Sequence, residues 1–195
     1  MKTYRIQSRC IAQPVPAGWR EQLARRLGGR PRRLGLWAEL GLYGALECLE
    51  RSKEQVLPAH AGLILSSRHG PARAVRSALD QTRDGLPLPL TFLQTQPSQL
   101  LAALSAQLQW RGDARFICHP DPLALVQLAM AIAHRLEGGL LMGWVDELDV
   151  ESSVWLRLQP VAHQEAGWQK AGDFATLTRD CSHIRLGPDG LEVLS

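Results

Sequence analysis

Residues that could carry chemistry stand together at Cys118 and His119, where an apolar run ends in a Pro-Asp-Pro corner. The apolar segment that follows, from Leu123 to about Leu136, has the composition of a helix. Many α/β enzymes present a nucleophile where a strand turns sharply into a helix. A Cys118 thiolate would gain from the helix N-terminus, but the Asp121 carboxylate at the same end would oppose it. His119 could act as an acid or base only with a partner that the sequence does not identify.

Two further groups of residues have reactive side chains. Cys181 and His183 would share a face of a strand, which permits a catalytic pair but is equally a packing arrangement. An acidic cluster follows the run that ends at Trp144, and it consists of Asp146, Glu147, Asp149 and Glu151. A metal would need their oxygens to converge, so a solvated loop is the simpler interpretation, and pairing with a partner's arginines is the functional one. We therefore expect no metal and no cofactor.

The composition is that of an ordinary globular protein, because 45% of its 195 residues are hydrophobic and 21% are charged. No apolar run approaches the roughly 20 residues that span a bilayer, and the N-terminus lacks the apolar core of a secretory signal. We expect one domain over residues 1–195, located in the cytoplasm. The cysteines lie far apart with no CxxC pair, so we expect buried, reduced thiols at Cys10, Cys48, Cys118 and Cys181.

Five arginines crowd the segment ARRLGGRPRRLG and supply much of the net charge of +3: Arg25, Arg26, Arg30, Arg32 and Arg33. We call this segment the arginine loop. A nucleic-acid site would favour aromatic side chains between the arginines, for stacking on bases, and none is present. The pattern therefore predicts a solvated loop or a contact with an acidic protein partner, and no nucleic-acid binding.

Hydrophobic periodicity predicts alternating strands and helices over the first 150 residues. Expected helices cover residues 19–27, 36–49, 72–82, 98–110 and 123–136, with Ser98 as a cap. Expected strands cover residues 4–12, 61–67, 115–118, 140–144 and 154–161, followed by a closing hairpin around a Gly-Pro-Asp-Gly turn. The proline-spaced segment 86–93 should be neither a central strand nor a helix. This alternation predicts an α/β fold with a mostly parallel mixed sheet and helices on both faces.

The serial order of these segments resembles the N-terminal half of a β-ketoacyl synthase, a condensing enzyme of the thiolase fold. The matching segments lie within roughly residues 60–148: AGLILSSRHGP, PLPLTFLQTQPSQLLAALSAQLQWRG, RFIC, LALVQLAMAIAHRLEGG and LLMGWVDEL. The resemblance implies a thiolase-like fold formed by a single truncated half, with the hairpin added at its end.

Two departures from the family bear on activity. The family's nucleophilic cysteine falls on His119, one place after Cys118, and the small residues after it are replaced by Pro120, Asp121 and Pro122. The family's catalytic histidines lie in a second half in a His-Gly-Thr-Gly-Thr context, which none of the six histidines here has. Because those histidines stabilise the enolate and the thioester oxyanion, the resemblance implies that this chain does not condense substrates alone.

The resemblance implies a chain-length-factor type of subunit in fatty acid, polyketide or aryl-polyene biosynthesis. Such a subunit would form a heterodimer with an active β-ketoacyl synthase and shape its acyl tunnel. The implied tunnel or interface residues are Thr91, Phe92, Leu93, Thr95 and Phe116, and the arginine loop could contact an acyl carrier protein. Two alternatives stay open: a stand-alone acyl-thioester enzyme that uses Cys118 or the Cys181/His183 pair, and a homodimeric carrier-protein-binding module.

Overall fold

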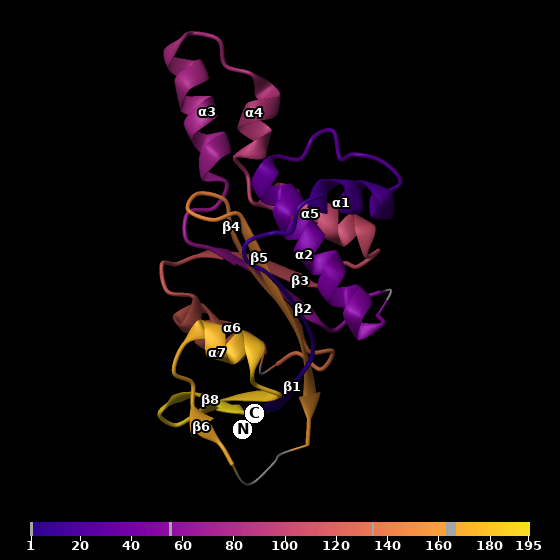
Figure 1. Ribbon diagram of the computed structural model, residues 1–195, viewed down its shortest axis with the longest axis vertical. Coiled ribbons are helices and arrows are strands. Elements are labelled where there is room, and N and C mark those ends of the chain that lie inside the picture. The colour runs from indigo at the N-terminus through magenta and orange to yellow at the C-terminus, as the bar shows by residue number, and fades with distance from the viewer. Residues whose placement is uncertain (1, 55, 134, 163–166) are drawn as a thin grey trace.

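A computed structural model of the chain describes residues 2–54, 56–133, 135–162 and 167–195 (Figure 1). Within these residues, one eight-stranded sheet has the order β3-β2-β4-β5-β1-β7-β8-β6. Its strands are β1 (Thr3–Ala12), β2 (Gly62–Ser67), β3 (Asp113–Cys118), β4 (Leu140–Asp146), β5 (Ser152–Val161), β6 (Gln169–Lys170), β7 (His183–Gly187) and β8 (Gly190–Leu194). The helices are α1 (Trp19–Leu27), α2 (Leu36–Ser52), α3 (Ala72–Arg83), α4 (Pro89–Gln94), α5 (Ser98–Gln107), α6 (Pro122–Ala133) and α7 (Phe174–Arg179).

The expected α/β class, mixed sheet and closing β7–β8 hairpin are confirmed. The sheet was expected to be mostly parallel, and this was wrong. Among the described strands, only β2 with β3 and β2 with β4 pair in parallel. The long strands β1 and β5 pair antiparallel with each other, and β5 is antiparallel to β4. The reason is the connection from β4 to β5, where residues 147–151 form a short turn in place of a crossover helix.

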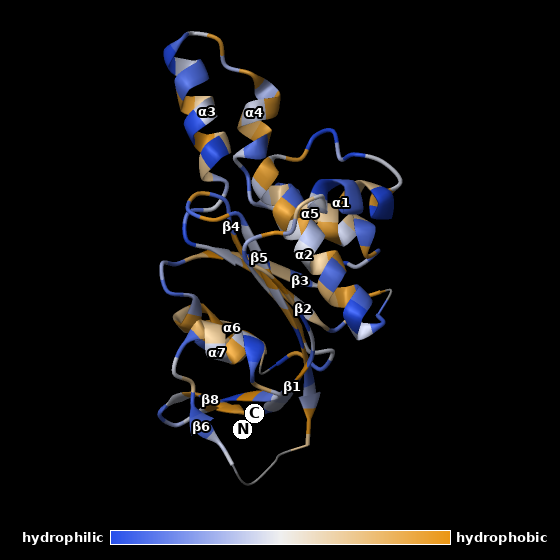
Figure 2. Cartoon of the chain, in the orientation of Figure 1, coloured by the Kyte–Doolittle hydropathy of each residue, from blue (hydrophilic) through white to orange (hydrophobic). Residues whose placement is uncertain are grey.

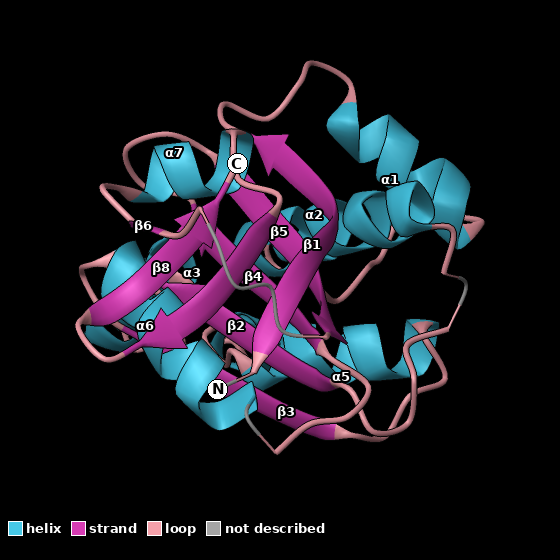
Figure 3. Cartoon of the chain, turned by 90° about the horizontal axis from the view of Figure 1, so that it is seen from below, coloured by secondary structure: helices cyan, strands magenta, loops and turns pink. Residues whose placement is uncertain are grey.

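Helices cover both faces of the sheet, as expected, and each face has its own apolar core (Figure 3). On one face α1, α2 and α5 pack around Trp37 and Trp155. On the other face α6 and α7 pack around Val126 and Ile184. At Gly44 the helix α2 lies so close to β5 that an added Cβ would come within 2.6 Å of the Trp155 ring.

Four helical details differ from expectation. Helix α4 forms inside the proline-spaced segment, because Pro89 stands at the start of the helix, where its missing N–H is not needed. Helix α7 was not anticipated, and its first turn is held by Asp173, whose carboxylate accepts the Thr176 N–H. Ser98 is not a cap, since Pro97 occupies the N-cap of α5. The helix expected over residues 123–136 is described as Pro122–Ala133, and His134 lies outside the described residues.

Helices α3 and α4 form a helical hairpin (residues 72–94) that projects beyond the end of the sheet (Figure 1). Neither helix has a buried residue, and orange, hydrophobic positions are visible on both (Figure 2). Most large apolar side chains that are exposed in the described part of the chain lie here: Val75, Leu79, Leu86, Leu88, Leu90, Phe92 and Leu93. Contiguous exposed apolar surface is commonly found at interaction sites. No helix among the described residues is long and apolar enough to cross a bilayer.

Candidate functional site: a closed elbow and an open hairpin

Residues 118–121 join the end of β3 to the start of α6, and we call this turn the elbow. The strand ends at Cys118, and the N–H of His119 still donates to the Ser67 carbonyl of β2 at 3.1 Å. At the start of α6, Asp121 Oδ1 accepts the N–H of Leu123 at 2.8 Å. The helix N-terminus would favour an anion, but the protein's own carboxylate already occupies it.

Backbone groups contact both side chains of the elbow, His119 and Cys118. The exposed His119 ring accepts the N–H of Asp121 at Nδ1, over 3.1 Å, so a neighbouring backbone group holds it. The Cys118 thiol is exposed and donates to the Arg68 carbonyl at 3.2 Å. Within the described residues, no hydrogen bond joins Cys118 to a histidine, the side chain that most often activates a nucleophilic thiol.

The other cysteines are buried free thiols, as expected; Cys118 differs because it ends an edge strand. Burial raises the pKa of Cys10 to about 12 and that of Cys48 to about 11. Burial also raises the pKa of Cys181, whose sulfur contacts the Thr176 carbonyl. His183 instead pairs its Nδ1 with the Ser182 hydroxyl at 2.9 Å, so the structure shows no contact between Cys181 and His183.

The acidic cluster is partly structural, so the solvated-loop interpretation was wrong for two of its members. Glu147 is buried, which raises its pKa, and its Oε1 accepts the Arg73 N–H at the start of α3 over 2.7 Å. Burial also raises the pKa of Asp146 and outweighs the opposing effect of a hydrogen bond from the Ser67 hydroxyl at 3.3 Å. Arg73 reaches Glu151 at 2.9 Å, so these carboxylates help to anchor the helical hairpin. The described residues contain no group of side chains that could hold a metal ion.

A pocket of about 240 Å³ lies beside the elbow, at the carboxyl ends of β2 and β4. Its polar lining includes Arg68, His69 and Asp146, and Trp144 and Phe174 form an aromatic wall with ring centroids 6.2 Å apart. Ligands of α/β proteins commonly bind at this end of a parallel sheet. Sequence reasoning missed this pocket, although polar residues directly after two apolar strand segments were a signal for it.

The implied tunnel residues divide between two places. Thr91, Phe92 and Leu93 lie on α4, where Phe92 is 63% exposed and Leu93 is 46% exposed. Thr95 follows the helix, and its hydroxyl donates to the Phe92 carbonyl at 2.7 Å. Phe116 lies on β3 instead, with its ring edge against Trp37 at a centroid distance of 5.6 Å.

Strand β3 forms one edge of the sheet, and much of it is exposed. Its outer groups include Asp113 and Arg115, which form an exposed ion pair at 2.7 Å. An uncovered strand edge offers unpaired backbone groups to another chain, so proteins rarely leave one open without a use.

The arginine loop is only partly neutralised. Arg26 forms ion pairs with Glu47 and Glu50, and Arg30 lies 3.4 Å from Glu21. Arg25, Arg32 and Arg33 are exposed and form no ion pair within the described part of the chain. A shallow hollow of about 600 Å³ lies beside Arg32 and Arg33, with Leu27, Leu42 and Ala103 among its apolar lining residues.

No family model matches this sequence, and no curated protein matches it either. Solved structures do match. The Xenorhabdus doucetiae structure of the ketosynthase ApeO in complex with its chain length factor ApeC matches with 14% identity and a TM-score of 0.57. That match covers 87% of this chain and 82% of the matched chain, so the two chains have similar lengths.

Two further structures extend the comparison. The AntDE:AntF complex, an acyl-carrier protein with its ketosynthase bound to the hexaketide, matches with 12% identity and a TM-score of 0.59, over 82% of this chain and 63% of the matched one. A β-ketoacyl synthase from Burkholderia phymatum STM815 matches with 10% identity and a TM-score of 0.56, over 83% of this chain and 60% of that one. At these identities the likeness establishes the fold, and the chain has the thiolase-like α/β fold of ketosynthases and chain length factors.

Proposed function

We propose that this chain is a non-catalytic, ketosynthase-like subunit of the chain-length-factor type, which pairs with an active β-ketoacyl synthase. The observation that carries this proposal is the closed elbow. Asp121 caps α6 where a nucleophile would be stabilised, and His119 is engaged by the backbone. The partner would supply the nucleophilic cysteine and the histidines that stabilise the enolate and oxyanion.

Two exposed features support pairing. Strand β3 is an open sheet edge, and the helical hairpin exposes apolar side chains that a monomer would normally cover. Thr91, Phe92, Leu93 and Thr95 are our proposed contacts to the partner and to the end of its acyl tunnel. Phe116 supports this surface from β3, because its ring fixes the edge strand against Trp37 of α2. The solved complex of a ketosynthase with its chain length factor, which this chain resembles in fold and matched length, agrees with such a role.

Co-expression tests the proposal. The chain is expected to copurify with an active β-ketoacyl synthase and to elute with it as one species whose light-scattering mass equals one copy of each. Purified alone, it should self-associate, because the helical hairpin is apolar and uncovered. A well-behaved monomer that binds no synthase would overturn the proposal.

A second contact is favoured by a separate observation, the unpaired arginines of the arginine loop. We propose that Arg25, Arg32 and Arg33 contact an acyl carrier protein, since acidic partners suit a cationic surface beside an apolar hollow. The fold-related complex of a ketosynthase with an acyl-carrier protein makes the carrier the natural candidate.

Replacing these three arginines by alanine should weaken carrier binding at low salt by about tenfold or more, because each exposed contact contributes up to ~1 kcal/mol. The measurement is a titration of labelled carrier at two ionic strengths. The matched control replaces Arg76, Arg111 and Arg135, which are also exposed. This control removes the same amount of positive charge. If both triple variants lose the same carrier-protein affinity, the effect is due to net charge alone, and the proposed contact between the arginine loop and the carrier protein is refuted.

A further inference from the structure

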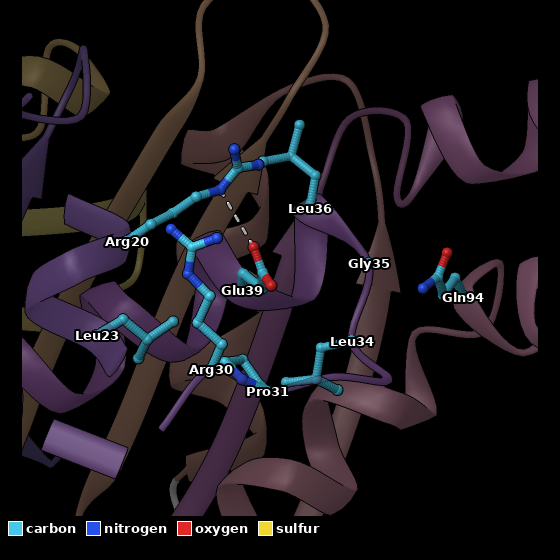
Figure 4. Close-up of a pocket in the computed structure, with 9 residues that line it drawn as sticks. All are labelled: Arg20, Leu23, Arg30, Pro31, Leu34, Gly35, Leu36, Glu39 and Gln94. Carbon is cyan, nitrogen blue, oxygen red and sulfur yellow. Dashed lines mark ion pairs between the residues drawn. The ribbon is translucent and has the colours of Figure 1, made fainter. Parts of the chain in front are cut away.

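A pocket of about 340 Å³ lies between α1, the arginine loop and the start of α2 (Figure 4). Two guanidinium groups reach it from different elements, Arg20 from α1 and Arg30 from the arginine loop. In Figure 4 both lie beside the carboxylate of Glu39. The remaining lining residues are Leu23, Pro31, Leu34, Gly35, Leu36 and Gln94.

The charges in this pocket do not balance. Glu39 is the one acidic residue of the lining, and its carboxylate lies 3.3 Å from Arg20 Nε. Among the described residues Arg30 forms an ion pair with Glu21 alone, which lies outside the pocket at 3.4 Å, and both of those side chains are largely exposed. Such an exposed pair contributes little, so the Arg30 guanidinium is available to a ligand.

The existing carboxylate is a poor counter-ion. The Glu39 side chain is only 19% exposed. Its burial raises its pKa, and this effect outweighs the opposite effect of the nearby Arg20 and Arg30 charges. An entering anion would therefore compete with Glu39 for the Arg20 guanidinium.

We infer that this pocket binds a small phosphate monoester. Guanidinium groups on two elements offer paired N–H donors from two directions, which suits the tetrahedral oxygens of a phosphate better than a planar carboxylate. Leu34 and Leu36, which are partly exposed, offer the phosphate substituent apolar contact. The volume is within the range of small-molecule sites and is too small for a folded partner.

The pocket also touches the helical hairpin. Gln94, the last residue of α4, closes one side, and a Cβ at Gly35 would lie 3.2 Å from the Gln94 Cβ. In Figure 4 Gln94 lies apart from the two guanidinium groups, so it bounds the pocket on the side of the helical hairpin. This position places the ligand near the proposed partner surface, but the inference does not depend on that partner.

Calorimetric titration of the purified chain with phenyl phosphate and with inorganic phosphate, in a low-chloride buffer, tests the site. We expect saturable one-to-one binding that is tighter for phenyl phosphate, because Leu34 and Leu36 contact the ring. Arg20→Gln and Arg30→Gln should each weaken binding by about tenfold or more. Glu39→Gln should strengthen it several-fold, because it frees Arg20 without removing volume.

The matched control is Arg25→Gln, an exposed arginine that is absent from the pocket lining, and it should bind phenyl phosphate as the unaltered chain does. Circular dichroism confirms that each variant is folded. Unchanged affinity in Arg20→Gln and Arg30→Gln, or an equal loss in Arg25→Gln, overturns the inference. Copurification of the same variants with a synthase is a separate readout, so failure of the phosphate site and failure of the proposed pairing are distinguishable.

Discussion

Replacement of Phe92 or Leu93 by aspartate is expected to abolish copurification with a β-ketoacyl synthase. An aromatic residue at the centre of an interface commonly contributes 2 kcal/mol or more, and a buried unpaired carboxylate adds a further cost, so the affinity should fall by about a hundredfold or more. Both side chains are exposed in the isolated chain, so its free energy of unfolding should change by about 0.5 kcal/mol or less.

Leu128→Asp is the matched control for this experiment. Leu128 is 46% exposed, as is Leu93, but it lies on α6 and outside the helical hairpin. The control should copurify at the level of the unaltered chain. If Leu93→Asp and Leu128→Asp copurify equally well, the helical hairpin is not the pairing surface.

Arg157→Gln is expected to lower the free energy of unfolding by about 3 kcal/mol, the cost of leaving one partner of a buried ion pair alone. Arg157 is fully buried on β5, and its guanidinium contacts both carboxylate oxygens of Glu54, at 2.6 and 2.9 Å. It also donates to the carbonyls of Gly138 and Leu158, so the pair ties the end of α2 to the loop before β4.

Urea unfolding of the purified chain, followed by circular dichroism, measures this loss. Arg115→Gln is the control, because Arg115 also contacts an aspartate through two nitrogens but at an exposed position. Its loss should stay below about 1 kcal/mol. A loss in Arg157→Gln no larger than that in Arg115→Gln would mean that the buried pair does not hold α2 to the sheet.

Local periodicity predicted most of the elements, because apolar spacing within ten residues is enough to identify helices such as α1 and strands such as β2. It could not give the sheet order. The pairing of β1 with β5 joins Thr3 to Val161, and such long-range registers depend on packing that no local pattern encodes. Arg157 shows the same limit: it alternates with Leu156 and Leu158, a pattern typical of a strand with one solvated face, yet it is fully buried against Glu54.

The sequence predicted where β3 would end and α6 would begin, at Cys118 and Pro122 within two residues. The role of Cys118 and His119 in this turn stays a prediction. The sequence could not show that Asp121 turns its carboxylate onto the Leu123 N–H, because that depends on the backbone of the Pro-Asp-Pro corner. It also could not show that Glu147 is buried beneath the start of α3.

The most direct test of a non-catalytic subunit is the condensation rate of the copurified pair when this chain carries both Cys118→Ala and His119→Ala. Both side chains are exposed, so the double variant should fold and pair normally. We predict a rate within about twofold of the unaltered pair, while replacing the synthase's own nucleophile should remove activity by several orders of magnitude. A loss of more than about tenfold from the double variant would contradict this account, because it would mean that the elbow of this chain takes part in the chemistry.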